Sequence, residues 1–413
     1  MKHILGSACQ NLHWRGQRVF PFALRGQRTL TSSFTDDHVA VLTTGEHQPP
    51  IAMNCQRLKD LVEDARSRPT RRHQKFGLSK SAKGYQYRST LRGWSTIVAA
   101  AACRRDREKG RQSNIDMHHL LDLVLEQGGL CAYSGIPMEL LKPNSHWRAS
   151  IERIDTNQGY RRGNCCLIAA EFNSAVHNAS HEAGTSSGSA QWSKQKVGEV
   201  ARIRTEDMPP QLLQEAIAVA KLRPGSGGKP AFAGDRGPDA ERKWRCTRCE
   251  LWKHEEQFYK QASRINVVKP LAWCKQCYLD SQSIRRKTLR GHGMHLLSVA
   301  RHRAAAKAAA WHGTFKLDWD DLLQMLWLQG GRCYYSGVPL CCAAGPADWV
   351  WSIERLDNSV TYTRENCVLI AQEFQTSDYS RNSAKYPVFG TAQWSRSKAS
   401  HIWGPYVLKN TVN

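Results

Sequence analysis

Four cysteines within one short segment have the spacing of a metal site. Cys246 and Cys249 form one Cys-x-x-Cys pair, and Cys274 and Cys277 form a second. Two such pairs supply four thiolates, the ligand set of a closed tetrahedral Zn²⁺ site in which the metal has a structural role. We therefore predict a zinc ribbon at residues 241–283, stabilised by its metal because so short a segment has little core of its own. Buried thiols or two disulfides are the alternative.

A long stretch of the sequence occurs twice. Residues 127–196 return at 329–398 with a constant offset of 202 residues. Within it, Ser-Ile-Glu-Arg-Ile-Asp at 150–155 becomes Ser-Ile-Glu-Arg-Leu-Asp at 352–357. Self-similarity at a fixed distance indicates a duplicated structural unit, here of roughly 110 residues once the flanking matches are included.

Polar residues recur in each copy in an order that resembles the HNH (ββα-metal) endonucleases. A turn with cysteine and Ser-Gly is followed by a strand ending in an acidic and a basic residue, by a central Asn, and by a last polar residue. The resemblance covers about 45 residues in each copy, from Cys131 to Asn173 and from Cys333 to Gln375. By position, the catalytic residues that it implies are Glu152, Arg153, Asn164 and Asn173 in the first copy and Glu354, Arg355, Asn366 and Gln375 in the second.

The resemblance implies metal-dependent phosphodiester hydrolysis, in which the acid and the last polar residue hold a divalent ion. In the family a histidine follows the acid and activates water as a general base, and the central Asn orients that base. Arg153 and Arg355 stand at this position here. An arginine stays protonated at any ordinary pH, so it cannot accept a proton from water, although it can clamp a phosphate.

This substitution leaves two hypotheses. In the first, the units are endonucleases in which Glu354, Asp357 and Asn366 hold Mg²⁺ or another divalent ion, and a metal-bound water or His312 supplies the nucleophile. In the second, they are catalytically inactive HNH-derived modules that bind DNA or RNA. The Glu-Arg segment then has a structural role, and Asn164 and Asn366 satisfy backbone groups of a turn.

The chain is strongly basic, with 59 Lys and Arg against 36 Asp and Glu and a formal net charge of +23. Such an excess favours polyanionic partners through counterion release and long-range attraction. Nucleic acid is the first candidate partner, DNA rather than RNA on the HNH resemblance. The cations expected to contact phosphates form two clusters: Arg104, Arg105 and Arg107, and Arg285, Arg286, Lys287 and Arg290. A solvated helix face and a membrane surface are the alternatives, although the apolar run 97–103 is too short to span a bilayer.

Each copy is predicted to begin with helices and to continue with short β segments, which makes the fold α+β. The expected helices are 95–109 and 117–127 in the first copy and 294–310 and 320–329 in the second. The expected strands are 150–154 and 352–356, each followed by a second apolar segment that turns into a helix. The upstream match of 90–93 with 288–291 has a shift of 198, so we place a small insertion in the second copy near 311–314.

The remaining sequence indicates how the chain is divided. HNH-like units are expected at 85–200 and 284–403, with a helix and flexible linker at 201–240 between the first unit and the zinc ribbon. Residues 1–40 resemble an organellar transit peptide or a disordered basic tail. Cysteine usage in so long a chain favours a reducing intracellular compartment, a mitochondrion or plastid if that peptide is real and the nucleus or cytoplasm otherwise.

Several conspicuous side chains are expected to be structural. Five tryptophans are expected to fill cores rather than to stack on bases: Trp147, Trp192, Trp349, Trp351 and Trp394. The adjacent cysteines at 165–166 and 341–342 are expected to be small core residues, and His177 and His181 to be solvated.

Overall fold

The computed structural model describes residues 50–67, 80–143, 145, 147–173, 192–207, 209–222, 236–262, 268–342, 347–375 and 394–407. The helices are α2 (Cys55–Ser67), α3 (Lys80–Arg88), α4 (Leu91–Glu108), α5 (Met117–Glu126), α6 (Lys194–Ile203), α7 (Pro210–Lys221), α8 (Lys275–Arg286), α9 (Leu289–Ala306), α10 (Trp319–Leu328) and α11 (Arg396–Trp403). The strands are β1 (Ala149–Arg153), β2 (Cys165–Ala169), β3 (Lys243–Arg245), β4 (Trp252–His254), β5 (Phe258–Ala262), β6 (Val268–Cys274), β7 (Trp351–Arg355) and β8 (Cys367–Ala371). Single 3₁₀ turns are η3 (Ala170–Phe172), η4 (Glu255–Gln257) and η5 (Gln372–Phe374).

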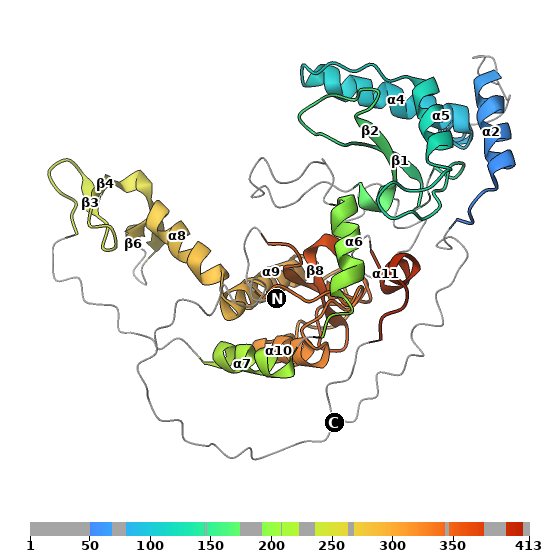
Figure 1. Ribbon diagram of the computed structural model, residues 1–413. Helices are drawn as coiled ribbons and strands as arrows, with labels where there is room; N and C mark the ends of the chain where they lie inside the picture. Colours follow the sequence, from blue (N-terminus) through green and yellow to red (C-terminus); the bar gives the residue numbers. More distant parts are fainter. Residues whose placement is uncertain are drawn as a thin grey trace.

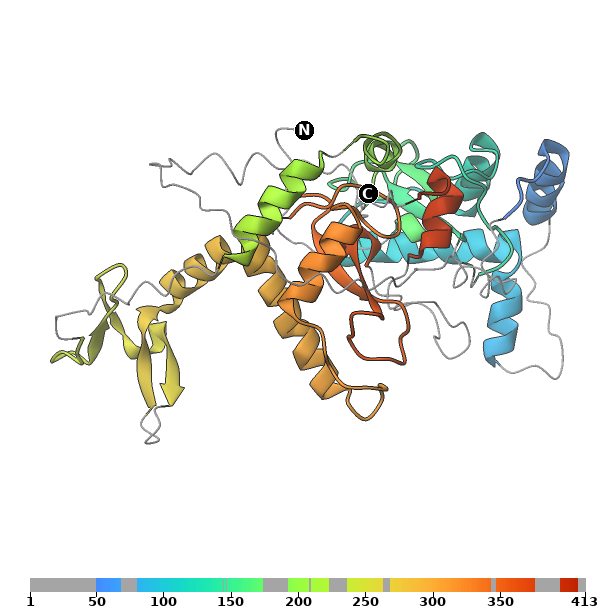
Figure 2. The same ribbon diagram turned by 90° about the horizontal axis from the view of Figure 1, so that it is seen from below.

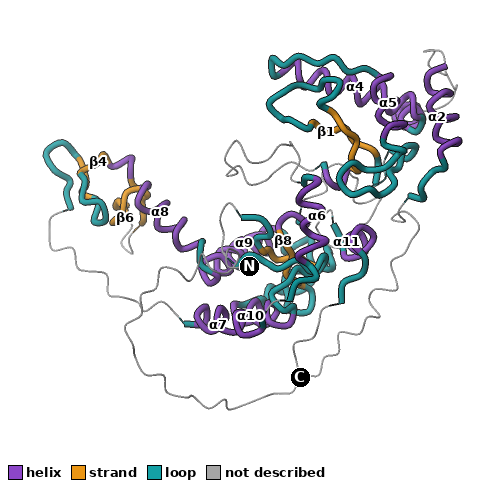
Figure 3. Tube along the Cα trace, viewed as in Figure 1, coloured by secondary structure: helices purple, strands orange, loops and turns teal. Residues whose placement is uncertain are grey.

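The fold is α+β, as predicted. The strands form two-stranded antiparallel sheets, and helices make up most of the rest (Figure 3). No helix in the described ranges has the length and apolar character needed to cross a membrane. The predicted tail at 1–40 and the two histidines at 177 and 181 lie outside the described residues, as do residues 208 and 223–235 of the segment predicted as helix and linker.

The two copies form matching units, which we call unit 1 (α4, α5, β1, β2, η3) and unit 2 (α9, α10, β7, β8, η5). The same residue types begin the helices: the Thr90 and Thr288 hydroxyls accept from backbone amides of α4 and α9, and Asp116 and Asp318 cap α5 and α10. The hairpins share one register, with the Glu-Arg pair at the end of β1 and of β7. The predicted insertion lies in the longer connection between α9 and α10 (307–318 against 109–116).

One glycine in each unit is required by a close approach of backbone. A Cβ at Gly93 would lie 1.8 Å from the Tyr87 carbonyl oxygen, and one at Gly291 would lie 1.9 Å from that of Arg285. These contacts occur where α3 turns into α4 and where α8 turns into α9. The shared Thr-Leu-Arg-Gly sequence is therefore explained by a cap and a tight bend.

The repeat begins earlier than residue 85. Helices α2 and α7 bury Leu, Val or Ile, and Ala at matched positions: Leu58, Val62 and Ala65 in α2, and Leu213, Ile217 and Ala220 in α7. Helix α2 packs on α4 and α5, and α7 packs on α9 and α10. The Arg92 guanidinium donates to the Ala65 carbonyl at 2.7 Å, and that of Arg290 donates to the Ala220 carbonyl at 3.0 Å. The helix expected at 201–240 thus belongs with unit 2.

The helix that follows each hairpin packs on the other unit. Helix α6 follows unit 1, yet its Lys196 ammonium lies 2.9 Å from the Glu373 carboxylate of unit 2 and 2.5 Å from that of Asp348. Helix α11 follows unit 2, yet its Lys398 ammonium lies 2.8 Å from the Glu171 carboxylate of unit 1. We call α6 and α11 the exchanged helices. Figures 1 and 2 show them where the two units meet.

A cluster of aromatic rings joins the units. Phe172, Trp192, Phe374, Trp394 and Trp403 form edge-on and stacked contacts with ring centroids 5.1–6.5 Å apart. Both units belong to one hydrophobic core. All five tryptophans expected in the core are buried, which confirms that prediction.

A separate module is inserted between α7 and unit 2. It comprises β3 to β6 and the first turn of α8, with a small core of its own around Cys246, Phe258 and Cys274. We call it the four-cysteine module. In Figures 1 and 2 it stands away from both units and is joined to unit 2 by α8. Unit 1 has only residues 68–79 at the equivalent place, between α2 and α3.

Candidate metal centre and nucleic-acid interface

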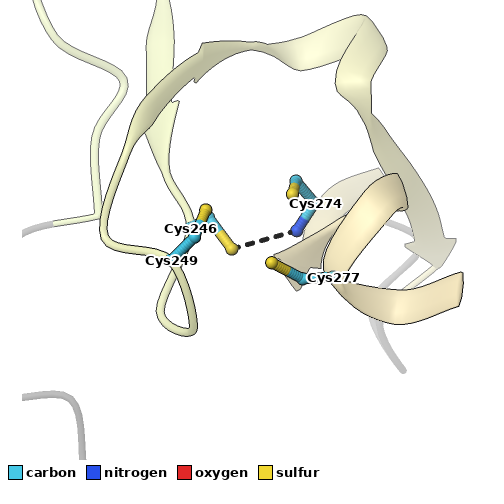
Figure 4. Close-up of side chains that lie close together, drawn as sticks. All are labelled: Cys246, Cys249, Cys274 and Cys277. Carbon is cyan, nitrogen blue, oxygen red and sulfur yellow. Dashed lines mark hydrogen bonds between the residues drawn. The ribbon is translucent and has the colours of Figure 1, made fainter. Parts of the chain in front are cut away.

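The four cysteines meet as the sequence predicts. The Sγ atoms of Cys246, Cys249, Cys274 and Cys277 all lie within 4.8 Å of one another. Tetrahedral thiolate coordination with metal–sulfur bonds of about 2.3 Å needs sulfur atoms about 3.8 Å apart, so the group can hold a metal ion with little movement. Figure 4 shows the first pair on the loop between β3 and β4, facing the second pair at the end of β6 and in the first turn of α8. It is the only such group of His, Cys, Asp or Glu in the described part of the chain.

Backbone amides favour the thiolate form of Cys246. Burial raises the pKa of the Cys246 thiol, but amide N–H groups of Cys249 and Cys274 outweigh it and lower that pKa to about 6. One of these contacts is the Cys274 amide donating to the Cys246 sulfur at 3.2 Å (Figure 4). The Lys253 ammonium lies 3.3 Å from the Cys274 sulfur. Donors and positive charge aimed at sulfur are the surroundings expected of a bound metal–thiolate centre.

In the Glu-Arg hairpins, the acid and the last polar residue lie on one face. In unit 2, the Gln375 amide donates to the Glu354 carboxylate at 3.1 Å and to the Ile353 carbonyl at 2.6 Å. In unit 1, Asn173 donates to the Ser150 hydroxyl at 2.8 Å and to the Ile151 carbonyl at 2.9 Å. The structure therefore brings Glu354 and Gln375 together.

Both acids are enclosed. Glu152 is 1% exposed and Glu354 is 0% exposed. The half-buried ring of Tyr133 lies near Glu152 and the buried ring of Tyr335 lies near Glu354, and burial followed by the charge of the acid raises both tyrosine pKa values. A carboxylate without solvent access cannot present a metal-bound water to a phosphodiester. Asp357, three residues further on, is exposed and points its carboxylate to Ser359.

The arginines at the histidine position hold the hairpin loop. Arg355 donates to the Asn358 and Val360 carbonyls at 3.1 and 2.7 Å, and its guanidinium lies 3.6 Å from the centroid of Trp311. In unit 1, Arg153 donates to the carbonyls of residues 156 and 158 at 2.9 and 3.0 Å. Both arginines are buried. One terminal nitrogen of each guanidinium donates to two loop carbonyls, and burial leaves neither guanidinium open to a phosphate.

The central asparagines close the same loop. The Asn366 side-chain oxygen accepts from the Asp357 amide at 2.8 Å, and its NH₂ group faces the carbonyls of residues 357, 360 and 361 at 3.0–3.1 Å. Asn164 repeats this pattern with the Asp155 amide and the carbonyls of residues 155 and 159. Every hydrogen-bonding group of each asparagine amide is therefore engaged with the turn.

Unit 2 carries an exposed histidine beside its loop. The insertion places the His312 amide 2.7 Å from the Ser359 carbonyl, and the Thr361 amide 3.0 Å from the His312 carbonyl. Hydrogen bonds from Ser359 lower the pKa of Asp357, and the charge of His312 adds to this effect. His312 and Asp357 thus lie at one exposed edge of unit 2, and the shorter loop of unit 1 has no counterpart to this histidine.

Most of the predicted phosphate-contacting cations are exposed, and two of the seven are anchored by other residues. Arg285, Arg286 and Lys287 are exposed, and no carboxylate in the described ranges lies within salt-bridge distance of them. Arg107 is exposed as well, and Arg104 is 70% exposed and paired loosely with Glu108 at 3.8 Å. The remaining two are anchored, Arg105 on the Tyr160 ring and hydroxyl and Arg290 on Trp319 and α7.

The residues that sequence reasoning missed are the lysines of the exchanged helices and the buried acids of η3 and η5 that they contact. Lys196 and Lys398 match at the repeat offset, as do Glu171 and Glu373. A charged residue retained in both copies at a position inside an apolar stretch was the available signal. This signal does not identify the partner of each charged residue, because the lysine–glutamate contacts join residues that are 177 and 227 positions apart in the sequence.

Comparisons with protein-family models, with curated proteins and with solved structures find no match to this chain.

Proposed function

We propose that this protein binds nucleic acid through the exposed cations at the end of α8 and at the end of α4, and that the HNH-like hairpins of its two units act as scaffold. The observation that carries the proposal is the group Arg285, Arg286 and Lys287, which is exposed and lacks acidic partners within the described part of the chain. Unpaired cations of one sign on a chain of net charge +23 favour phosphate contacts, which position a ligand without reading its bases.

The metal that we propose for the four cysteines is zinc in a structural role. All four coordination positions are supplied by protein sulfur, which excludes an open position for water. Soft thiolates in tetrahedral geometry select zinc over magnesium or calcium. The metal would stabilise the module and so fix the orientation of α8, from which the cations project.

Burial of Glu152 and Glu354 and the loop contacts of Arg153 and Arg355 support binding without hydrolysis at these hairpins. The Glu-Arg segment acts as a fold element: the acid faces the inside and the arginine holds the loop carbonyls.

The test of binding is fluorescence polarisation with a labelled 20-base-pair duplex at increasing NaCl. Wild-type affinity is expected to fall steeply with salt, and Arg285→Ala/Arg286→Ala/Lys287→Ala should weaken binding and reduce the slope by about three. Arg202→Ala is the matched control, because Arg202 is an exposed arginine paired with Glu206 on α6. An affinity that is insensitive to salt, or equal losses in both variants, would refute the proposal.

A second candidate function is metal-dependent phosphodiester hydrolysis by unit 2. It is favoured by His312 and Asp357, which share an exposed edge. Supercoiled plasmid incubated with Mg²⁺ or Mn²⁺ tests it. Nicking that is abolished by EDTA, by His312→Ala and by Asp357→Ala would establish a nuclease. Plasmid that migrates more slowly in a gel but stays intact would show binding without hydrolysis.

A further inference from the structure

The four-cysteine module has exposed aromatic rings that its own core does not need. Phe258 and Cys274 pair across β5 and β6 and are buried. Tyr259 and Trp273 are the next residues on these strands, at an irregularity in the pairing between Phe258 and Lys260, and neither belongs to the core of the module. They are 39% and 36% exposed.

Each of these rings is accompanied by a cation. The Arg248 guanidinium lies 5.1 Å from the centroid of Trp273, and the Lys275 ammonium lies 5.7 Å from that of Tyr259. Neither Arg248 nor Lys275 has a carboxylate within salt-bridge distance among the described residues. The acids of the module are paired with other cations, as in Lys243–Glu241, Arg245–Glu250 and Lys260–Glu255. We call Tyr259, Trp273, Arg248 and Lys275 the aromatic–cation face.

We propose that the aromatic–cation face binds an unpaired stretch of nucleic acid, with bases stacked on Tyr259 and Trp273 and phosphates near Arg248 and Lys275. This inference rests on the proposed function and adds a substrate class to it. A duplex hides the faces of its bases in its own stack, whereas a single strand can offer them to aromatic side chains. The two cations favour a negatively charged polymer as the ligand. The flat exposed rings favour a nucleic acid whose bases are unpaired and therefore free to stack on them.

The position of the face extends this argument to the rest of the chain. Lys275 begins α8, and Arg285 and Arg286 end the same helix next to unit 2. A strand held on the face and a duplex held at the end of α8 can therefore belong to one molecule. The ligand that suits the whole protein is a duplex with a single-stranded extension or gap.

The experiment compares labelled dT20, a 20-mer of abasic sites with the same phosphates, and a 20-base-pair duplex, using the full chain. Stacking should make dT20 bind at least tenfold more tightly than the abasic strand, since each stacked base contributes roughly 5- to 150-fold. Tyr259→Ala/Trp273→Ala should remove this difference and leave duplex affinity within about twofold. The ring-retaining variant Tyr259→Phe/Trp273→Phe should preserve most of it.

Two controls keep the result interpretable. Tyr85→Ala removes a ring that is 40% exposed on α3, the helix that corresponds to α8, and should change nothing. Zinc content and circular dichroism report whether each variant keeps the module folded. Equal affinity of wild type for dT20 and the abasic strand overturns the aromatic–cation proposal but leaves salt-sensitive duplex binding intact. Absence of binding to all three probes overturns the proposed function itself. Displacement of dT20 by polyglutamate, with the same dependence on both rings, assigns the face to an acidic peptide and also overturns the proposal.

Discussion

The exchanged helices predict that a single buried lysine stabilises both units at once. The side chains of Lys398 and Glu171 are 4% and 0% exposed. Replacing Lys398 by Met leaves the Glu171 carboxylate buried without its cation. Removal of one partner of a buried ion pair costs about 3–5 kcal/mol, because the remaining charge loses its compensation. We therefore expect Lys398→Met to lower the free energy of unfolding by about that amount.

Unit 2 supplies a graded comparison. Lys196 has two carboxylate partners, Glu373 and the more exposed Asp348. Loss of Glu373 still leaves Asp348 beside the ammonium, whereas Lys196→Met leaves the buried Glu373 carboxylate without this cation, so Glu373→Gln should cost less than Lys196→Met. The double variant Lys398→Met/Glu171→Leu removes both charges and should recover most of the stability lost in Lys398→Met.

Urea unfolding followed by tryptophan fluorescence measures these differences, since the emission reports on the ring cluster between the units. Arg104→Met is the control, because its exposed pair with Glu108 contributes less than about 1 kcal/mol. A loss below 1 kcal/mol for Lys398→Met, or equal losses for Glu373→Gln and Lys196→Met, would show that the two helices are not held by these pairs in solution.

Four further predictions concern pH, metal, the hairpin loop and the backbone. Burial lowers the pKa of Lys196, but Glu373 and Asp348 raise it above 10.5 overall. The stability that comes from this raised pKa is present below pH 10.5 and is lost as the pH rises through the pKa of Lys196 in the folded protein. Urea melts at increasing pH should therefore show a smaller loss of stability at alkaline pH for Lys196→Met than for the wild type. A zinc chelator should unfold the four-cysteine module and leave the urea midpoint of the two units unchanged, as near-ultraviolet circular dichroism can show. Arg355→Leu should lower the free energy of unfolding by about 2–4 kcal/mol, because the loop carbonyls lose their donor and Trp311 loses its cation. Arg364→Leu is the control, since Arg364 is partly exposed. Equal losses in the two variants would contradict the role of Arg355 in holding the loop. Gly291→Ala should be more destabilising than Gly330→Ala measured by thermal melts, since a Cβ at Gly330 meets no atom within 4 Å and only its positive φ opposes alanine.

The local elements could be predicted from the sequence because local chemistry determines them. Apolar residues at helical spacing and Asp116 or Asp318 as caps place α5 and α10 within a residue or two of their expected bounds. The cysteine spacing predicts the metal centre, because two Cys-x-x-Cys turns leave few other ways to satisfy four thiols. The sequence predicts correctly that the Glu-Arg segment lies on a strand, but the residue types alone do not show whether the glutamate faces solvent or the interior.

The arrangement between units could not be predicted for a physical reason. Lys196 lies within a short amphipathic helix that can complete either copy, since the two copies offer the same glutamate and the same phenylalanine. Only the three-dimensional path of the chain selects Glu373 over Glu171. Helix α7 was assigned to the linker for a related reason: the inserted module separates it along the chain from the elements that it packs on.

The exchanged helices make the order of synthesis matter. On a ribosome, unit 1 is made first, yet the helix that closes it spans Arg396–Trp403, and its Lys398 is made 227 residues after Glu171. Until then Glu171 has no Lys398, and the aromatic cluster lacks Trp394 and Trp403. A premature stop codon near position 390 would therefore remove few residues from the end of the chain and leave the first half of the protein unable to finish folding.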